Sequence, residues 1–377
     1  MGSAAVYQLA RRGNRVLGIE QFFPPHNNGS SHGETRIIRQ AIGEGEEYVP
    51  LVLRSYELWH EIEKEIGNEI LTITGGLVLE SRHGTAVMHG RRHFLDQTIR
   101  CARKFNIRHE ILDAKDIRQR YPQFTITDER GYFEYETGYL KPELCIQAQL
   151  SLAERYGAKL QMNEQVLSVN HGRSGDIIIV ETDRAVYHTD KLIIAAGPWI
   201  TRFLESPYSG YLKIHRQVMY WFNVRDDAIA KFSVGTFPIF IWICDKGGDF
   251  FYGFPSLDGK TVKMASEQYA NVTTPETVDR KIAAEEKESM YQSYVQGRLP
   301  EIVNICSKAE TCLYTTTPDS NFVIDFCPGQ NRILIASPCS GHGFKHSAAI
   351  GEVLAELIMD GKSKVDIRSF GFERFAS

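Results

Sequence analysis

The first 22 residues constrain the fold most, because they place a helix, a turn, a strand and an acid in a fixed order. Apolar side chains between residues 3 and 12 recur at helical spacing, and Gly13 stands where a helix C-cap is expected. The apolar run 15–22 then predicts a strand that ends near Glu20. This order is the second half of a dinucleotide-binding βαβ unit, and it is equally common in ordinary α/β proteins.

If the unit binds a dinucleotide, its two marker residues have assigned tasks. Gly2 is then the third glycine of G-x-G-x-x-G, at which a helix packs closely on a strand, and Glu20 is the acid that accepts hydrogen bonds from the ribose hydroxyls. The first strand and the first two glycines have no counterpart before Gly2. The sequence therefore predicts a sheet without its first strand, short by about a dozen residues, and leaves open whether the true N-terminus lies upstream of Met1.

Changes of pattern along the rest of the chain predict two interleaved parts. Helical periodicity marks residues 46–66, 84–105, 143–156 and 347–359, and strand-like runs mark 70–80, 159–196 and 215–255, with a hairpin turn at 246–249. We expect a mixed α/β nucleotide-binding domain made of residues 1–80, 145–212 and 315–377. An antiparallel-sheet substrate domain is expected from residues 81–144 and 213–314.

Composition excludes several classes of partner. The 43 basic side chains do not exceed the 47 acidic ones, so nothing in the charge balance predicts binding to nucleic acid. The longest apolar run, 237–244, is far below the roughly 20 residues of a membrane span. Seven cysteines form no CxxC pair, which favours reduced thiols in a cytoplasmic protein. His26 and His32 have no carboxylate cluster beside them, and we expect no metal site.

Two polar segments are candidates for ligand binding. The loop SGHGFK, 340–345, precedes the final helix, where glycines and the helix dipole suit an anion or a reduced flavin, although such turns are also common without a ligand. Arg36 and Arg39 would share one face if their segment were helical, and guanidinium groups bind carboxylates; a solvated basic turn is the alternative. Taken alone, Cys312 is typical of a buried strand cysteine. Lys263 and Glu267 are typical of the surface.

Four ordered segments together resemble the monomeric sarcosine oxidase and N-methyltryptophan oxidase family of covalent flavoproteins, within the glutathione-reductase-like FAD fold. They are residues 22–55, 252–263, 312–325 and 340–345, and the resemblance extends over nearly the whole chain. It implies a monomer that oxidises an N-methyl amino acid by hydride transfer to flavin N5. Oxygen is then reduced to hydrogen peroxide, and formaldehyde and the demethylated amino acid are released.

The resemblance also assigns roles to particular residues. Cys312 would carry the flavin through a thioether, and its surroundings should favour the thiolate. Arg39 and Lys345 would clamp the substrate carboxylate, and Lys263 would promote oxygen reduction as a fixed positive charge. The remaining matches are His32 and Arg36 beside the flavin ring, Tyr252 and Tyr314 in the substrate pocket, and Gly341 and Gly343 at the helix start that faces the flavin.

Four residues at three places depart from the family pattern and leave the substrate open. Glu267 stands where close relatives of sarcosine oxidase have histidine, Ile42 where they have tyrosine, and Pro338-Cys339 where they have a Gly-Phe-like pair. Sarcosine, a larger N-methyl amino acid, or a cyclic amine such as pipecolate or proline remain alternatives. A truncated flavin-fold protein without activity is the alternative from another functional class.

Overall fold

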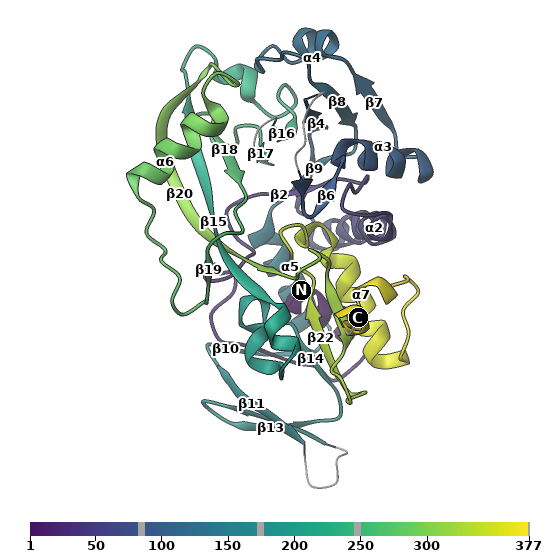
Figure 1. Ribbon diagram of the computed structural model, residues 1–377. Helices are drawn as coiled ribbons and strands as arrows, with labels where there is room; N and C mark the ends of the chain where they lie inside the picture. Colours follow the sequence, from purple (N-terminus) through teal and green to yellow (C-terminus); the bar gives the residue numbers. More distant parts are fainter. Residues whose placement is uncertain (82–86, 172–176, 245–249, 376–377) are drawn as a thin grey trace.

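The computed structural model describes residues 1–81, 87–171, 177–244 and 250–375, which form a mixed α/β fold (Figure 1). The α-helices of the described residues are α1 Gly2–Arg11, α2 Val49–Ile66, α3 Phe94–Lys104, α4 Ala114–Arg120, α5 Pro142–Arg155, α6 Ala284–Met290 and α7 Ser347–Asp360. A π-helical turn, Tyr291–Val295, continues α6. Among these described residues, no helix has both the length and the apolar character needed to cross a membrane. Nor do three or more potential metal ligands gather anywhere in the described part of the chain.

The largest sheet has nine strands and occupies the upper half of Figure 1. Its strands are β4 Gly76–Glu80, β7 His109–Leu112, β8 Arg130–Glu134, β15 Lys213–Val224, β16 Ile239–Ile243, β17 Phe250–Gly253, β18 Thr261–Ser266, β19 Val272–Thr273 and β20 Ile302–Thr316. Neighbouring strands are antiparallel except for the parallel pair β16 and β4. An aromatic-rich core packs against this sheet.

The remaining strands form smaller sheets. They are β1 Leu17–Glu20 with β10 Lys159–Met162; β2 Arg36–Ile38 with β9 Gly138–Leu140 and β3 Leu71–Ile73; β5 Val87–Met88 with β6 Arg91–Arg92; β11 Val166–His171 with β12 Ile178–Thr182 and β13 Val186–Thr189; and β14 Leu192–Ile194 with β22 Ile333–Ser337 and β21 Val323–Phe326. The pairs β1–β10 and β14–β22 are parallel, but no described strand joins them into one sheet.

The N-terminal helix forms as the sequence predicts. It ends in Arg11, Gly13 follows with φ +78°, and β1 ends at Glu20. The helix lies against α7 at very short range, because a Cβ at Gly351 would come within 2.5 Å of the Ala4 Cβ. Glycine at this crossing lets the two helices approach.

Two local expectations were wrong. A helix over 84–105 was expected, but α3 begins only at Phe94, because His89, Gly90 and His93 adopt positive φ and interrupt the helix. The Arg36 segment is strand β2, so Arg36 and Arg39 lie three positions apart in extended chain and do not share a helical face. The expected hairpin turn at 246–249 lies outside the described residues.

Candidate functional site

Cys312 lies in the middle of a cluster contributed by the nine-stranded sheet. The cluster contains Met219, Trp221 and Ala265, and Tyr252 and Tyr314 pack against it. The thiol is buried, and its Sγ is 3.7 Å from Nη2 of Arg36. Burial raises the pKa of Cys312, whereas the positive charges of Arg36 and Lys263 oppose that rise. The resemblance implied surroundings that favour the thiolate; in the folded chain burial outweighs the two cations, so the pKa of Cys312 lies above its ordinary value and the thiol form is favoured.

Lys263 is not a surface residue, contrary to the interpretation of its segment in isolation. It lies on β18 with 4% of its surface exposed. Burial is the main reason why the pKa of Lys263 is well below its ordinary value, and the positive charge of Arg36 lowers it further. Its Nζ donates to the carbonyl oxygens of Gly33 and Thr35 at 2.6 and 2.9 Å, and to Thr35 Oγ1 at 3.0 Å. The Thr35 hydroxyl can also donate, so this cage suits both the charged and the neutral amine.

His32 and the two tyrosines complete this side of the site. His32 Nε2 lies 2.9 Å from the carbonyl oxygen of Thr311, and burial with the charge of Arg36 lowers the pKa of His32 to about 3. Its Nδ1 is buried without a hydrogen-bond partner among the described residues. Tyr252 and Tyr314 are hydrogen-bonded to each other, and burial raises the pKa of Tyr252 to about 12. These side chains are neutral at physiological pH.

Arg39 and Lys345 converge on one carboxylate, that of Glu44. Arg39 Nη2 lies 2.5 Å from Glu44 Oε2, and Lys345 Nζ lies 3.9 Å from Glu44 Oε1. All three side chains are nearly fully buried. Burial opposes ionisation of Glu44, but the two cations outweigh it and hold its pKa well below the usual value. Sequence reasoning found both cations and missed Glu44.

Glu267 and His89 extend this group, and sequence reasoning did not connect them. The Glu267 side chain is 4% exposed, so its interpretation as a surface residue was wrong. His89 Nε2 lies 2.9 Å from Glu267 Oε2, and His89 Nδ1 lies 3.2 Å from Glu44 Oε1. His89 carries no local signal, since it sits in the short turn between β5 and β6.

The two glycines of the loop before α7 have packing reasons of their own. Gly341 has φ +82°, and a Cβ there would lie 3.0 Å from the Tyr314 ring. A Cβ at Gly343 would lie 1.7 Å from the carbonyl oxygen of Pro338, so only glycine fits. Among the described residues, the backbone N–H of Gly341 has no hydrogen-bond acceptor. A free donor just before the 3-10 turn Phe344–His346 and α7 fits an anionic ligand atom.

Gly2 and Glu20 lie at the predicted nucleotide end of the fold. Burial lowers the pKa of the Met1 amino group, while the charges of Cys339 and Glu20 oppose that effect. Glu20 Oε1 accepts a hydrogen bond from the Phe22 N–H at 3.0 Å. A Cβ at Gly2 would meet only the Ala195 Cβ, at 4.0 Å, so the close helix-to-strand packing expected at Gly2 is absent within the described residues.

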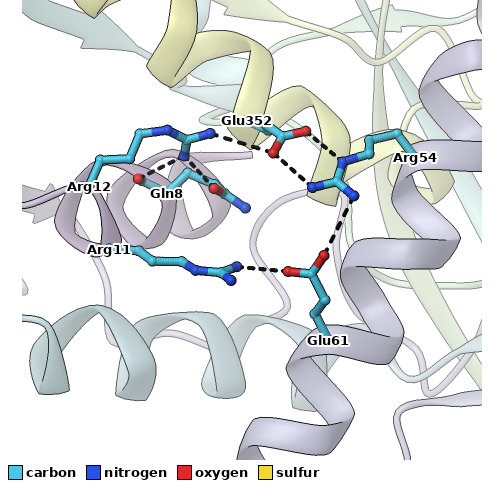
Figure 2. Close-up of a pocket in the computed structure, with 6 residues that line it drawn as sticks. All are labelled: Gln8, Arg11, Arg12, Arg54, Glu61 and Glu352. Carbon is cyan, nitrogen blue, oxygen red and sulfur yellow. Dashed lines mark hydrogen bonds and ion pairs between the residues drawn. The ribbon is translucent and has the colours of Figure 1, made fainter.

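Figure 2 shows a separate surface pocket whose lining residues are mutually paired. Glu352 of α7 accepts from Arg54 Nε and Nη2 of α2 at 2.8 and 3.0 Å, and Arg12 Nη2 of α1 lies 3.5 Å away. Arg11 and Arg54 both reach Glu61, at 2.9 and 3.5 Å. Each guanidinium already has a carboxylate, so this pocket is a set of ion pairs that joins three helices.

We expect Glu352→Gln to lower the free energy of unfolding by about 1 kcal/mol, because it removes the bidentate partner of Arg54 at a partly buried position. Thermal unfolding checks this, with a fall in Tm of about 2 °C expected. Glu57→Gln is the matched control, since Glu57 also pairs with Arg54 but is 64% exposed, and its variant should unfold at the wild-type temperature. Equal shifts in both variants would contradict a role for the α2–α7 pair.

Comparison with known proteins shows the family and the fold of the chain. The family model described as FAD dependent oxidoreductase (DAO) matches residues 1–357. Monomeric sarcosine oxidase of Streptomyces avermitilis is 38% identical, with 100% of this chain and 96% of the relative covered. N-methyl-L-tryptophan oxidase of Escherichia coli is 32% identical, with the same two shares covered. The solved structure of NikD, an unusual amino acid oxidase essential for nikkomycin biosynthesis, matches with a TM-score of 0.82 at 21% identity, over 98% of this chain and 94% of NikD, and shows the same fold.

Proposed function

This chain belongs to the family of FAD-dependent oxidoreductases, and from that premise we propose that it oxidises the N-methyl group of a secondary amino acid. It is an FAD-dependent amino acid oxidase of the sarcosine oxidase and N-methyltryptophan oxidase type. The finer proposal is that oxygen is the electron acceptor and that hydrogen peroxide, formaldehyde and the demethylated amino acid are the products. FAD, when bound, supplies the hydride acceptor and passes the electrons to oxygen.

The convergence of Arg39 and Lys345 on a single carboxylate is the observation that carries the substrate class. Arg39 and Lys345 already share Glu44, but a guanidinium has five N–H donors and an ammonium three, so the two buried cations can take the carboxylate of a bound amino acid as a second partner. Held in this way, the substrate presents its methyl group in one orientation. Tyr252 and Tyr314, hydrogen-bonded to each other, are proposed to form the wall that excludes water from the reacting carbon.

The residues proposed to hold FAD fit that cofactor. The buried Sγ of Cys312 beside Arg36 suits attachment of a flavin, and the N–H of Gly341 can donate to an anionic ring oxygen. The Nδ1 of His32 is an acceptor, because Nε2 carries the proton that is donated to the Thr311 carbonyl, so it suits an N–H of the flavin ring. Glu20 is proposed to bind the ribose hydroxyls. We also propose the two-domain division, with residues 1–80, 145–212 and 315–377 binding FAD and the other two segments, 81–144 and 213–314, forming the substrate domain.

Purification followed by a substrate panel tests the function. We expect a yellow protein that releases peroxide with sarcosine, N-methyl-L-tryptophan or another N-methyl amino acid, and proline and pipecolate are included as the cyclic alternatives. A colourless protein that gains no activity when FAD is added would overturn the proposal and favour a flavin-fold protein without activity.

Covalent attachment is tested separately, by acid precipitation. We expect wild-type protein to keep its flavin absorbance in the precipitate, and Cys312→Ser to lose it to the supernatant, because serine is a far weaker nucleophile than a thiolate. Cys306→Ser is the matched control on the same strand β20, with a half-buried thiol, and should keep its flavin. Retention of flavin by Cys312→Ser would place the linkage elsewhere.

A further inference from the structure

A buried row of alternating charges adjoins the proposed carboxylate clamp. It runs from Arg39 to Glu44, from Glu44 to His89 and from His89 to Glu267, with contacts of 2.5, 3.2 and 2.9 Å. Each of the four side chains is at most 5% exposed. Glu267 comes directly after the end of β18, the strand that carries Lys263. The row therefore connects the clamp with that strand.

His89 is an imidazolium in this row. Both of its ring nitrogens face carboxylate oxygens, and an ionised carboxylate only accepts hydrogen bonds, so both nitrogens must donate. Burial works against the charge, but Glu267 and Glu44 outweigh it and raise the pKa of His89 to about 9. The row thus contains two cations and two anions and is neutral in total.

The groups packed around the row do not change this balance above neutral pH. Burial lowers the pKa of Lys345 to about 7. The histidines and tyrosines packed around the row are uncharged, because burial holds the pKa of His342 and His346 well below its ordinary value and raises that of Tyr252, Tyr269 and Tyr314. Arg36 keeps its charge on the far side of Tyr252 throughout this pH range. A ligand with no net charge can enter without a compensating proton, whereas a monoanion needs one more cation in the site.

One oxygen of Glu267 is available to a ligand. Its Oε2 contacts His89 and accepts from the Tyr269 hydroxyl, but its Oε1 receives no hydrogen bond from any described residue. That Oε1 is 3.2 Å from the position that a Cβ on Gly341 would occupy, and the Tyr314 ring is 3.0 Å from the same point. The free oxygen therefore lies beside Gly341 and close to the Tyr314 ring of the proposed pocket.

We infer that Glu267 binds the protonated amine of the substrate, held in position by His89, so that the site takes its amino acid as a zwitterion. The inference rests on the proposed function, because it uses the same pocket and the same carboxylate clamp. Glu267 is then a specificity-determining residue at a position where the family resemblance led us to expect histidine. His89 is a positioning residue that acts through Glu267.

Two ligands of nearly equal shape test this in the wild-type holoenzyme. N,N-dimethylglycine is a zwitterion, and 3-methylbutanoate is the monoanion with CH in place of NH⁺. Calorimetric titrations without oxygen give the dissociation constant of each from about pH 6 to about pH 8.5. The monoanion should lose about tenfold in affinity per pH unit above about pH 7, as Lys345 loses its proton, and the zwitterion should change less than about threefold. Parallel pH dependence of the two ligands would overturn the inference.

Charge-removing variants give a second, independent result. Glu267→Gln should reduce the preference for the zwitterion over the monoanion by at least about tenfold, and His89→Gln should increase that preference, because it removes a cation from the row. This preference is the ratio of the two dissociation constants, 3-methylbutanoate over N,N-dimethylglycine. A merely structural disturbance would change that ratio in the same direction in both variants. Tyr269→Phe is the control that keeps every formal charge and removes only a hydrogen bond to Glu267 Oε2, so it should keep the wild-type ratio.

Failure of this inference is distinguishable from failure of the proposed function. Suppose that the protein releases peroxide from an N-methyl amino acid but that Glu267→Gln leaves the ratio of the two dissociation constants unchanged. The proposed oxidase function would then stand, and the role of Glu267 would be overturned. Absence of peroxide with every amine, and of heat with either ligand, would overturn both. The binding ratio itself does not depend on turnover.

Discussion

Lys263→Met should slow reoxidation of the reduced enzyme by oxygen by about 100-fold or more and leave reduction by substrate nearly unchanged. Lys263 is the buried cationic side chain that sits beside Cys312 and Arg36 and is caged by Gly33 and Thr35. A positive charge in a buried site lowers the cost of adding an electron to oxygen far more than an exposed charge does. Methionine keeps nearly the length of the side chain, and it removes the charge together with the hydrogen bonds to Gly33 and Thr35.

Stopped-flow absorbance separates the two half-reactions. Lys308→Met is the matched control, since Lys308 also lies over the Trp221 ring, at 4.3 Å against 5.5 Å for Lys263, but is partly exposed and paired with Glu34. That control should reoxidise at the wild-type rate. Equal losses in reduction and reoxidation in Lys263→Met would contradict the assignment and place Lys263 among the substrate-binding groups.

The same lysine predicts a pH dependence. Because burial and Arg36 hold the pKa of Lys263 below its ordinary value, the charged form is lost at a lower pH than for an exposed lysine. The reoxidation rate constant should therefore be highest at low pH and fall as pH rises through that pKa. In Lys263→Met this dependence should disappear.

Arg39→Ala should raise the dissociation constant for 3-methylbutanoate about 100-fold, because it removes one of two buried cations from the carboxylate clamp. It should also lower the free energy of unfolding by roughly 3 to 5 kcal/mol, since Glu44 loses its closest cation inside the protein. Calorimetric titration and denaturant unfolding measure the two effects separately.

The double variant Arg39→Met, Glu44→Gln separates binding from stability. With both charges removed, we expect most of the stability to return, because no uncompensated carboxylate remains beside the clamp. The affinity for 3-methylbutanoate should stay low, since the guanidinium is still absent. Wild-type affinity in either variant would contradict the role of Arg39 in carboxylate binding.

Local patterns in the sequence were sufficient for several elements. Periodicity and end signals predicted α1, α2, α5 and α7 to within a few residues, because each helix buries an apolar stripe and ends near a glycine that adopts positive φ. Residue spacing was misleading at Arg36 and Arg39. Their interval of three suits a helix, but pairing of β2 with β9 decided the conformation.

The missed site residues share a physical reason. His89 and Glu267 are 178 positions apart, and no composition or periodicity connects them. Glu44 follows Arg39 by five positions, and only the fold of the intervening chain brings their side chains into contact. Charged residues at such positions resemble surface residues until burial is known. Resemblance to a family assigned roles to Arg39, Lys345, Cys312 and Lys263 because their motifs are contiguous in sequence, and those roles stay predictions.

The positions of Cys312 and Lys263 both depend on the register in which β15 pairs with its neighbours β20 and β18. Gln217 lies opposite Cys312, and Trp221 lies opposite Lys263. Because Gln217 and Trp221 are both on β15, this one strand fixes the position of the thiol relative to the amine. Cys312 and Tyr314 share a face only because two positions separate them. Insertion of one residue between them would turn one of the two away, so length changes within β20 are expected to be far less tolerated during divergence than amino-acid replacements.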